Sequence, residues 1–345
     1  MHPIWALRRS AIAVAATSGG VAGVAMLAGP VLAHGPVPSE PPMIASLLLG
    51  WTFDPIPTLA IGAAVAWWFW AVGRVNARHR ANPVPRRRTA AFLGAMFALA
   101  VALISGIERY DTTLFSIHMV QHVVLLLIVA PLVALAAPVT LILRLTSSAT
   151  RGRWILPFLH SRVMRVVAFP VTAWVVFAAV LWSSHFSGLF DVALENPLAH
   201  DLEHGIFLAS ALLFWWPAVG LDPAPWRLGH PARIAHIFMQ MTQNTFLAAV
   251  ILNVPTVLYQ HYATLGRPYG IDPLADQKLA AGVMWIAGDA IFLTAIMLLV
   301  AGWMLAEARG LARADRQADL DLAQIRIRER RLADRLADER GEVRR

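Results

Sequence analysis

Eight long runs of apolar residues constrain this chain more than any other feature of its sequence. They lie at roughly 11–33, 56–74, 89–107, 114–143, 164–183, 199–220, 232–256 and 279–305. Because a helix needs about 20 mostly apolar residues to cross the hydrocarbon core of a bilayer, each run is long enough to span a membrane. The repeated pattern predicts an all-α fold, a polytopic transmembrane helical bundle.

The composition agrees with this prediction. Of the 345 residues, 58% are hydrophobic and 14% are charged, and the mean hydropathy is +0.58, values typical of a polytopic membrane protein. The net charge of +8 comes almost entirely from arginines in the loops and the tail, so it indicates membrane topology and not nucleic-acid binding. The chain has no cysteine, which excludes disulfides, thiolate metal sites and a Cys-x-x-Cys relay.

The first apolar run has the features of a signal peptide. It follows a pair of arginines and ends in "GPVLAHG", where Val31 and Ala33 form the small-residue pattern of a cleavage site. We expect cleavage after Ala33, which leaves seven spans, whereas retention of the run as an anchor gives eight. The predicted segments are a signal peptide or first transmembrane helix (1–33), an extracytoplasmic Pro-rich segment (34–55), a seven-helix transmembrane domain (56–305) and a charged cytoplasmic helical tail (306–345).

Arginine and lysine predict the orientation of these spans. Of the 29 such residues, 26 lie on one side, at the N-terminus, in 74–88, 144–165 and 221–233, and after Leu305. The other side has only Arg109, Arg267 and Lys278. Since basic residues concentrate in cytoplasmic loops, we predict a multi-pass protein of the bacterial inner membrane with its mature N-terminus outside and its C-terminus in the cytoplasm.

Two histidine pairs lie at the predicted outer ends of two spans. "HMVQH" opens the run at 114 and "HDLEH" opens the run at 199. Residues four apart share one helix face, about 5–6 Å from each other, which is close enough for two imidazoles to bind one metal ion. If the two spans are neighbours, all four imidazoles converge. We therefore predict that His118, His122, His200 and His204 are metal ligands.

The residue types leave the bound group open. Imidazole suits copper, zinc and iron, and thioethers suit Cu(I), so Met119 and Met284 are possible additional ligands. Asp201 and Glu203 can orient the imidazoles as hydrogen-bond acceptors. Paired histidines on facing helices also ligate haem, and a copper or proton transporter can use such a cluster as an entrance, with Asp289 as a group midway through the membrane.

Polar residues and prolines inside the later runs have simpler explanations. Amides in the run 232–256 are expected to form hydrogen bonds between helices. Prolines within the runs are expected to kink their helices. The amides are Gln240, Gln243, Asn244 and Asn253, and the prolines are Pro131, Pro217 and Pro255. No nucleotide-binding loop, G-x-S-x-G elbow or H-E-x-x-H motif is present, so the sequence gives little support for an enzyme.

Three separated motifs carry a resemblance to a known family. "FSIHMVQHVVLLLIVAPLVALAAP", "HDLEHGIFLASALLFWWP" and "LADQKLAAGVMWIAGDAIFL" occur in this order. Together they resemble the CtaG family of cytochrome c oxidase assembly proteins, the multispanning kind associated with caa3-type oxidases. The resemblance covers roughly 50–305 and excludes the first run and the tail.

The resemblance implies a non-enzymatic factor that acts at a copper-centre step of oxidase assembly, with oxidase subunits or copper chaperones as partners in the lipid bilayer. It adds Asp276 and Met284 to the four histidines as candidate metal-site residues. The matching positions are His118, Gln121, His122, Pro131, His200, His204, Asp276, Gln277, Met284 and Trp285. A soluble copper chaperone that shares the CtaG name depends on cysteines, so its mechanism cannot apply to this chain.

Overall fold

The computed structural model describes residues 38–265 and 269–342, and all regular structure in these ranges is helical. The predicted signal peptide lies outside the described residues. The helices in chain order are α2 (Ile44–Leu49), α3 (Pro55–Arg78), α4 (Arg86–Ile104), α5 (Gly106–Asp111), α6 (Phe115–Val123), the π-helix η1 (Val124–Val129), α7 (Ala130–Ala136), α8 (Pro138–Leu145), α9 (Ser148–Thr150), the π-helix η2 (Arg151–Ile155), α10 (Leu156–Leu159), α11 (Arg162–Val167), α12 (Pro170–Phe186), α13 (Leu189–Glu195), α14 (Pro197–Val219), α15 (His230–Asn253), α16 (Gln260–Thr264) and α17 (Pro273–Glu342). The predicted all-α class is confirmed for this part of the chain.

Five helical segments in the described ranges are long and apolar enough to cross a membrane. They are Pro55–Arg78, Arg86–Asp111, Phe115–Leu145, Pro197–Val219 and Pro273–Ala333. A sixth is obtained if α12 and α13, which meet at a bend of 72°, are counted as one span. The helix α15 has 24 residues but is not among the five, because its amides and basic residues lower its hydropathy. The total of seven spans stays a prediction.

The continuous segment formed by α6, η1 and α7 is the central element of the bundle. On one side, Leu125 and Val129 pack into a cluster with α3 and α4. On the other side, Leu126 and Ala130 pack into a larger cluster with α12, α14, α15 and α17. Because both faces are buried, apolar residues occur at nearly every position of this segment, which explains its unbroken hydrophobic sequence.

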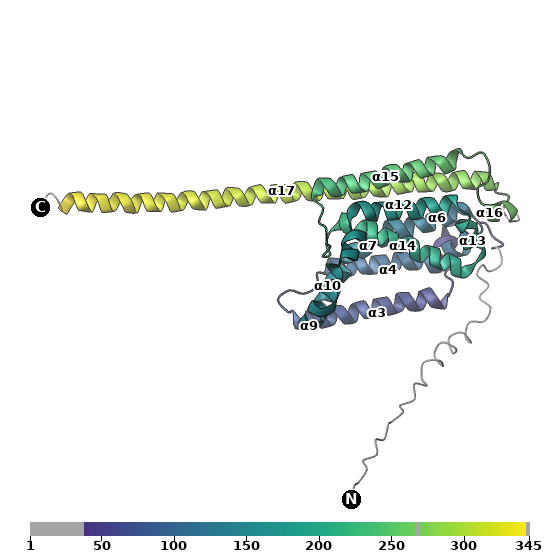
Figure 1. The fold of residues 1–345 in the computed structure, drawn as a ribbon, viewed down its shortest axis with the longest axis horizontal. Coiled ribbons are helices and arrows are strands. Elements are labelled where there is room, and N and C mark those ends of the chain that lie inside the picture. Colours follow the sequence, from purple (N-terminus) through teal and green to yellow (C-terminus); the bar gives the residue numbers. More distant parts are fainter. Residues whose placement is uncertain (1–37, 266–268, 343–345) are drawn as a thin grey trace, which may run out of the picture. The chain divides into compact units, whose positions relative to one another are not determined.

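The helices α15 and α17 lie side by side along much of the bundle (Figure 1). Asn244 donates to the carbonyl oxygen of Met284 at 3.0 Å, and Thr245 donates to Asp289 at 2.6 Å. At Gly288 a β-carbon would lie 2.8 Å from the Asn244 amide nitrogen, so glycine permits this close approach. Asn244 therefore joins two helices, as expected, and so does Gln243, which accepts from the Trp182 indole of α12. Asn253 instead bonds within α15, and the buried Gln240 amide has no hydrogen-bond partner among the described residues. Asp289 has a hydrogen-bonding role between α15 and α17.

The two ends of the bundle differ in their charged residues. Figure 1 shows α13 and α16 at one end and α9 and α10 at the other. The first end holds the starts of α6, α14 and α17. The second holds the arginine-rich connections, where the Arg78 side chain donates to the Leu145 carbonyl at 2.7 Å and the Trp226 indole donates to the Arg165 carbonyl at 2.8 Å. The histidine pairs and most arginines therefore lie at opposite ends.

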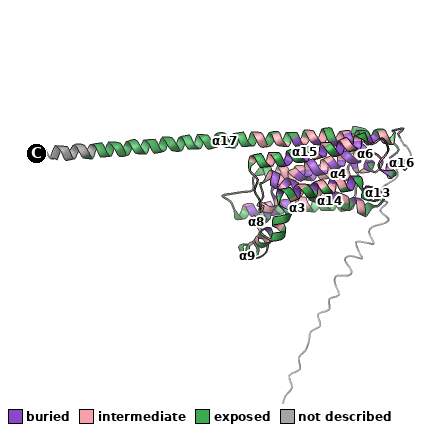
Figure 2. Cartoon of the chain, turned by 45° about the horizontal axis from the view of Figure 1, so that its top comes forward, coloured by how far each residue is buried: buried purple, intermediate pink, exposed green. Residues whose placement is uncertain are grey.

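The long helix α17 continues past the end of the bundle. No helix break marks the boundary expected near residue 305, since α17 runs from Pro273 to Glu342. Residues 301–333 are exposed, in contrast to the buried residues of the bundle (Figure 2). One proline behaves differently from the prediction: Pro255 does not kink α15 but follows its end at Asn253, because a residue before proline is biased away from helical conformation.

Candidate metal centre

The four predicted histidines are the fourth and eighth residues of two neighbouring helices. His118 and His122 lie on α6, and His200 and His204 lie on α14. The helix α14 begins at Pro197, and the side chain of the preceding Asn196 caps it by accepting a hydrogen bond from the backbone N–H of Ala199. The helix α6 begins at Phe115, so each histidine pair starts three residues after the first residue of its helix. All four side chains are buried, with exposed fractions between 0% and 6%. The structure removes them from water.

The four imidazoles face one another. The ring centroids within each pair are 4.3 Å apart. Between helices, the centroid of His118 lies 5.5 Å from that of His200 and 6.3 Å from that of His204, and His122 lies 5.8 Å from His204. The Nε2 atoms of His118 and His122 are 2.9 Å apart. We call these four residues the histidine cluster. The two helices that carry them are therefore neighbours. Convergence of the four imidazoles required this contact, which could not be predicted from the sequence.

Two carboxylates, of the buried Asp111 and the partly buried Glu203, lie against the histidine cluster. An oxygen of Asp111, at the end of α5, lies 3.4 Å from Nε2 of His200. Asp111, His118 and His200 each have a ligand atom within 4.8 Å of the others, and so do His118, His122 and Glu203. Glu203 accepts a hydrogen bond of 2.6 Å from Ser184 on α12. The site thus combines neutral nitrogen donors with anionic oxygen donors, a combination that suits a divalent cation.

Several buried ring nitrogens of the cluster have no hydrogen-bond partner. These are Nδ1 of His118, Nδ1 of His122 and Nε2 of His204. A buried polar atom without a partner is rare in native proteins and is commonly explained by a ligand, a water or an ion. The residues present therefore fit a metal ion.

Aromatic rings surround the histidine cluster. Phe190 packs against His118 at a centroid distance of 4.9 Å, and Phe207 packs against His122 at 4.6 Å. Tyr262, on α16, donates through its hydroxyl to the backbone carbonyl of Asp111 at 2.6 Å. Burial, followed by the nearby charge of Asp111, raises the pKa of Tyr262, so its phenol stays protonated and remains a donor. These contacts exclude water and hold α5 against the site.

Asp276 lies beside the start of α6, and its role as a metal ligand stays a prediction. Its oxygen accepts a hydrogen bond of 2.7 Å from the backbone N–H of Phe115 and a longer one of 3.4 Å from that of Ser116. These are free donors at the start of α6, which favour a carboxylate. Asp276 is not in either of the described groups that could hold a metal. It fixes α17 to the start of the helix that carries His118 and His122.

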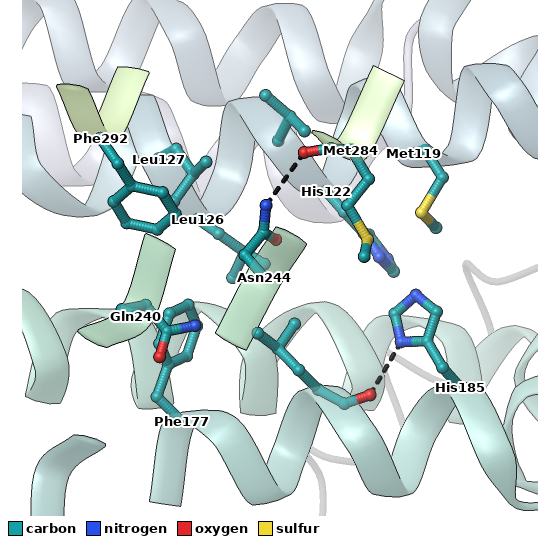
Figure 3. Close-up of a pocket in the computed structure, with 12 residues that line it drawn as sticks. Met119, His122, Leu126, Leu127, Phe177, His185, Gln240, Asn244, Met284 and Phe292 are labelled. Atoms are coloured by element: carbon teal, nitrogen blue, oxygen red, sulfur yellow. Dashed lines mark hydrogen bonds between the residues drawn. The ribbon is translucent and has the colours of Figure 1, made fainter. Parts of the chain in front are cut away.

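Met284 lies beside the cluster, in the lining of a small cavity. The cavity has a volume of about 30 Å³, and its lining includes Met119, His122, His185 and Met284 (Figure 3). Of the predicted residues, the structure therefore brings the four histidines together, places Met284 next to His122 and places Asp276 at the end of α6.

Sequence reasoning missed Asp111 and His185. Asp111 lies seven residues before His118, at the end of the preceding span. A search for acidic residues at the same predicted depth in the membrane as "HMVQH" could have found it. His185 lies in the last turn of α12, a helix with no second histidine, so no spacing pattern singled it out. Of the other acids, Glu203 contacts the site as a possible ligand, whereas Asp201 is exposed.

Three mycobacterial proteins are similar to this chain in sequence. The chain is 33% identical over 296 residues to uncharacterized proteins of Mycobacterium bovis and Mycobacterium tuberculosis, a match that covers 82% of this chain and 44% of each relative. An uncharacterized protein of Mycobacterium leprae is 29% identical over 287 residues, covering 81% of this chain and 43% of the relative. The chain therefore spans less than half the length of these relatives. No solved structure matches it significantly.

A family profile described as cytochrome c oxidase caa3 assembly factor matches residues 66–306. The matched range contains the histidine cluster, both carboxylates beside it and the cavity. It covers more than half of the chain. This protein therefore belongs to the Caa3_CtaG family of cytochrome c oxidase assembly factors.

Proposed function

We propose that this protein binds copper at the histidine cluster and supports formation of a copper centre in cytochrome c oxidase. The observation that carries the proposal is the convergence of four buried imidazoles from two helices in a member of an oxidase assembly family. Copper is the cargo in this proposal. The protein is a binding and assembly factor without catalytic activity.

The spacing of the nitrogen atoms supports a shared ion. Two imidazole nitrogens bound to one ion, with bonds of about 2 Å as for zinc, lie about 2.8–3.3 Å apart. The Nε2 atoms of His118 and His122 are 2.9 Å apart, within this range. A haem, the alternative in the sequence analysis, needs a flat pocket large enough for a porphyrin ring. The cavity beside His122 has a volume of only about 30 Å³. The geometry favours an ion over a porphyrin.

The charge balance supports a cation. Asp111 is fully buried, and the one ion pair that the described residues form with it is that with His200. Burying a carboxylate without a compensating charge costs several kcal/mol in real proteins. A copper ion among the imidazoles would supply that charge to both Asp111 and Glu203. The acids in turn would hold the ion more tightly than four neutral ligands alone.

The proposed topology places this site on the side from which an oxidase receives copper. We propose seven spans in the bacterial inner membrane, with α15 as one of them and with the arginine-rich end in the cytoplasm. The histidine cluster, at the opposite end, then faces outward. Oxidase subunits and copper chaperones on the outer side are the partners that this location allows.

Complementation tests the function. In a strain that lacks this gene, His118→Ala with His122→Ala should reduce oxidase activity at least tenfold, while the protein remains at wild-type level in the membrane. His160→Ala is the matched control, because His160 is exposed near the end of α10, at the other end of the bundle. Full oxidase activity with the double variant would contradict the proposal. Copper flux into vesicles that needs His118 would instead indicate a transporter.

A further inference from the structure

A small cavity adjoins the histidine cluster on its inner side. Its lining includes the side chains of Met119 and His122 from α6, His185 from α12 and Met284 from α17, with apolar residues and the amides of Gln240 and Asn244 around them. Figure 3 shows both sulfur atoms and the two imidazoles turned toward one space. Four soft or borderline metal donors from three helices therefore line a volume of about 30 Å³, while about 10–15 Å³ is enough for a water-sized group.

The hydrogen bond of His185 fixes which of its nitrogens can bind a metal. Its Nδ1 atom lies 2.8 Å from the carbonyl oxygen of Leu181. A carbonyl oxygen only accepts, so Nδ1 carries the proton and the neutral ring has its lone pair on Nε2. Metal-binding histidines are commonly oriented by this type of bond to a backbone carbonyl.

The lone pair of His185 is directed into the cavity. Its Nε2 atom is buried and has no hydrogen-bond partner, and the residue is only 3% exposed. In Figure 3 this nitrogen points toward His122 and the methionine sulfur atoms. Core packing alone explains buried methionines, which fill gaps, but it does not explain a buried acceptor that faces them without a donor.

The charge of the lining distinguishes this space from the histidine cluster. Asp111 and Glu203 lie against the cluster, whereas the lining of the cavity includes no acidic residue. Neutral thioether and imidazole ligands suit Cu(I), which is soft and carries one positive charge. Imidazoles with carboxylates suit a divalent ion. The two sites therefore differ in the oxidation state that they favour.

We propose that Met119, His122, His185 and Met284 form a second copper site, selective for Cu(I), which shares His122 with the histidine cluster. The proposal rests on the proposed function, because it takes copper as the cargo. His122 lines the cavity, and its Nε2 lies 2.9 Å from that of His118, so its ring borders both sites. Neutral His122 has one free lone pair and therefore serves one site at a time. Exchange of Cu(I) between the sites makes and breaks coordination bonds, moves the ring proton of His122 between Nε2 and Nδ1 where the two sites use different nitrogens, and needs no electron donor.

X-ray absorption of the purified full-length protein, loaded with Cu(I) under anaerobic reducing conditions, tests the proposal. We expect sulfur neighbours around copper in the wild type. Met119→Leu with Met284→Leu, which keeps side-chain size, should lose the sulfur signal and weaken Cu(I) binding at least tenfold against a Cu(I)-specific chelator. Met96→Leu is the control, because Met96 is buried in the separate cluster around α3 and α4.

The outcomes separate this proposal from the proposed function. The Met119→Leu, Met284→Leu protein should still bind Cu(II) at the histidine cluster, which also shows that it is folded. Wild-type Cu(I) with only nitrogen and oxygen neighbours, or unchanged Cu(I) affinity in the double variant, would overturn the second site and leave the function intact. If the wild type binds copper in neither oxidation state, both proposals fail.

Discussion

At the scale of single residues, Asp276 joins two helices beside the candidate metal centre. The carboxylate joins the start of α17 to the first backbone N–H groups of α6. His118 follows three residues after Phe115, so an error in this contact would shift the first imidazole of the cluster. The contact therefore gives Asp276 a positioning role.

Substitutions of Asp276 separate positioning from ligation. Asp276→Asn keeps an oxygen acceptor for the N–H of Phe115, so we expect unchanged copper stoichiometry and little change in stability. Asp276→Ala removes the acceptor and should lower the free energy of unfolding by about 1–2 kcal/mol, as loss of a helix cap does. Unfolding in detergent and copper titration measure the two effects. Loss of copper from a folded Asp276→Asn protein would show that Asp276 is a ligand after all.

At the scale of elements, the π-helix η1 leaves the carbonyl of Leu126 available to a side-chain donor. The N–H of Ala130 bonds to the carbonyl of Leu125, five residues earlier. In the same register the carbonyl of Leu126 would need the N–H of residue 131, which is a proline and has none. The indole of Trp215 on α14 donates to this carbonyl at 2.9 Å. The bond ties the two histidine-bearing helices together below the cluster.

Neighbouring tryptophans provide a matched test of this bond. Trp215→Phe should lower the free energy of unfolding by about 1–3 kcal/mol, because it leaves a buried carbonyl without a donor. Trp216→Phe is the control: its indole nitrogen is buried without a hydrogen-bond partner, so its loss breaks no bond. Reversible unfolding in mixed micelles measures both variants. Equal destabilisation by the two changes would contradict this role for Trp215.

Much of the fold follows from local sequence patterns, while the completed site does not. Each of the seven later apolar runs overlaps a described helix, and four-residue spacing places His118 with His122 and His200 with His204. The hydropathy of a helix does not predict which other helices it contacts. The approach of Asp111 to His200 and of His185 to Met284 depends on packing between distant segments. The break of the central segment into α6, η1 and α7 depends on Pro131 together with a partner on another helix.

At the scale of the whole molecule, the proposed orientation can be tested without removing any native thiol, because the chain has no cysteine. Ser187 is exposed at the histidine end, and Ser148 is exposed at the arginine end. In intact cells, a membrane-impermeant maleimide should label Ser187→Cys and should reach Ser148→Cys only after the membrane is opened. The opposite pattern would reverse the topology and place the histidine cluster in the cytoplasm.

The central claim is that two histidine pairs, contributed by α6 and α14, bind one copper ion. Its most direct test is the Cu(II) content of the purified full-length protein after removal of loosely bound metal. The wild type and His160→Ala should retain tightly bound copper. Because the four imidazoles share one ion, His118→Ala with His122→Ala and His200→Ala with His204→Ala should each reduce copper content at least tenfold. Wild-type copper content in either folded double variant would contradict the account.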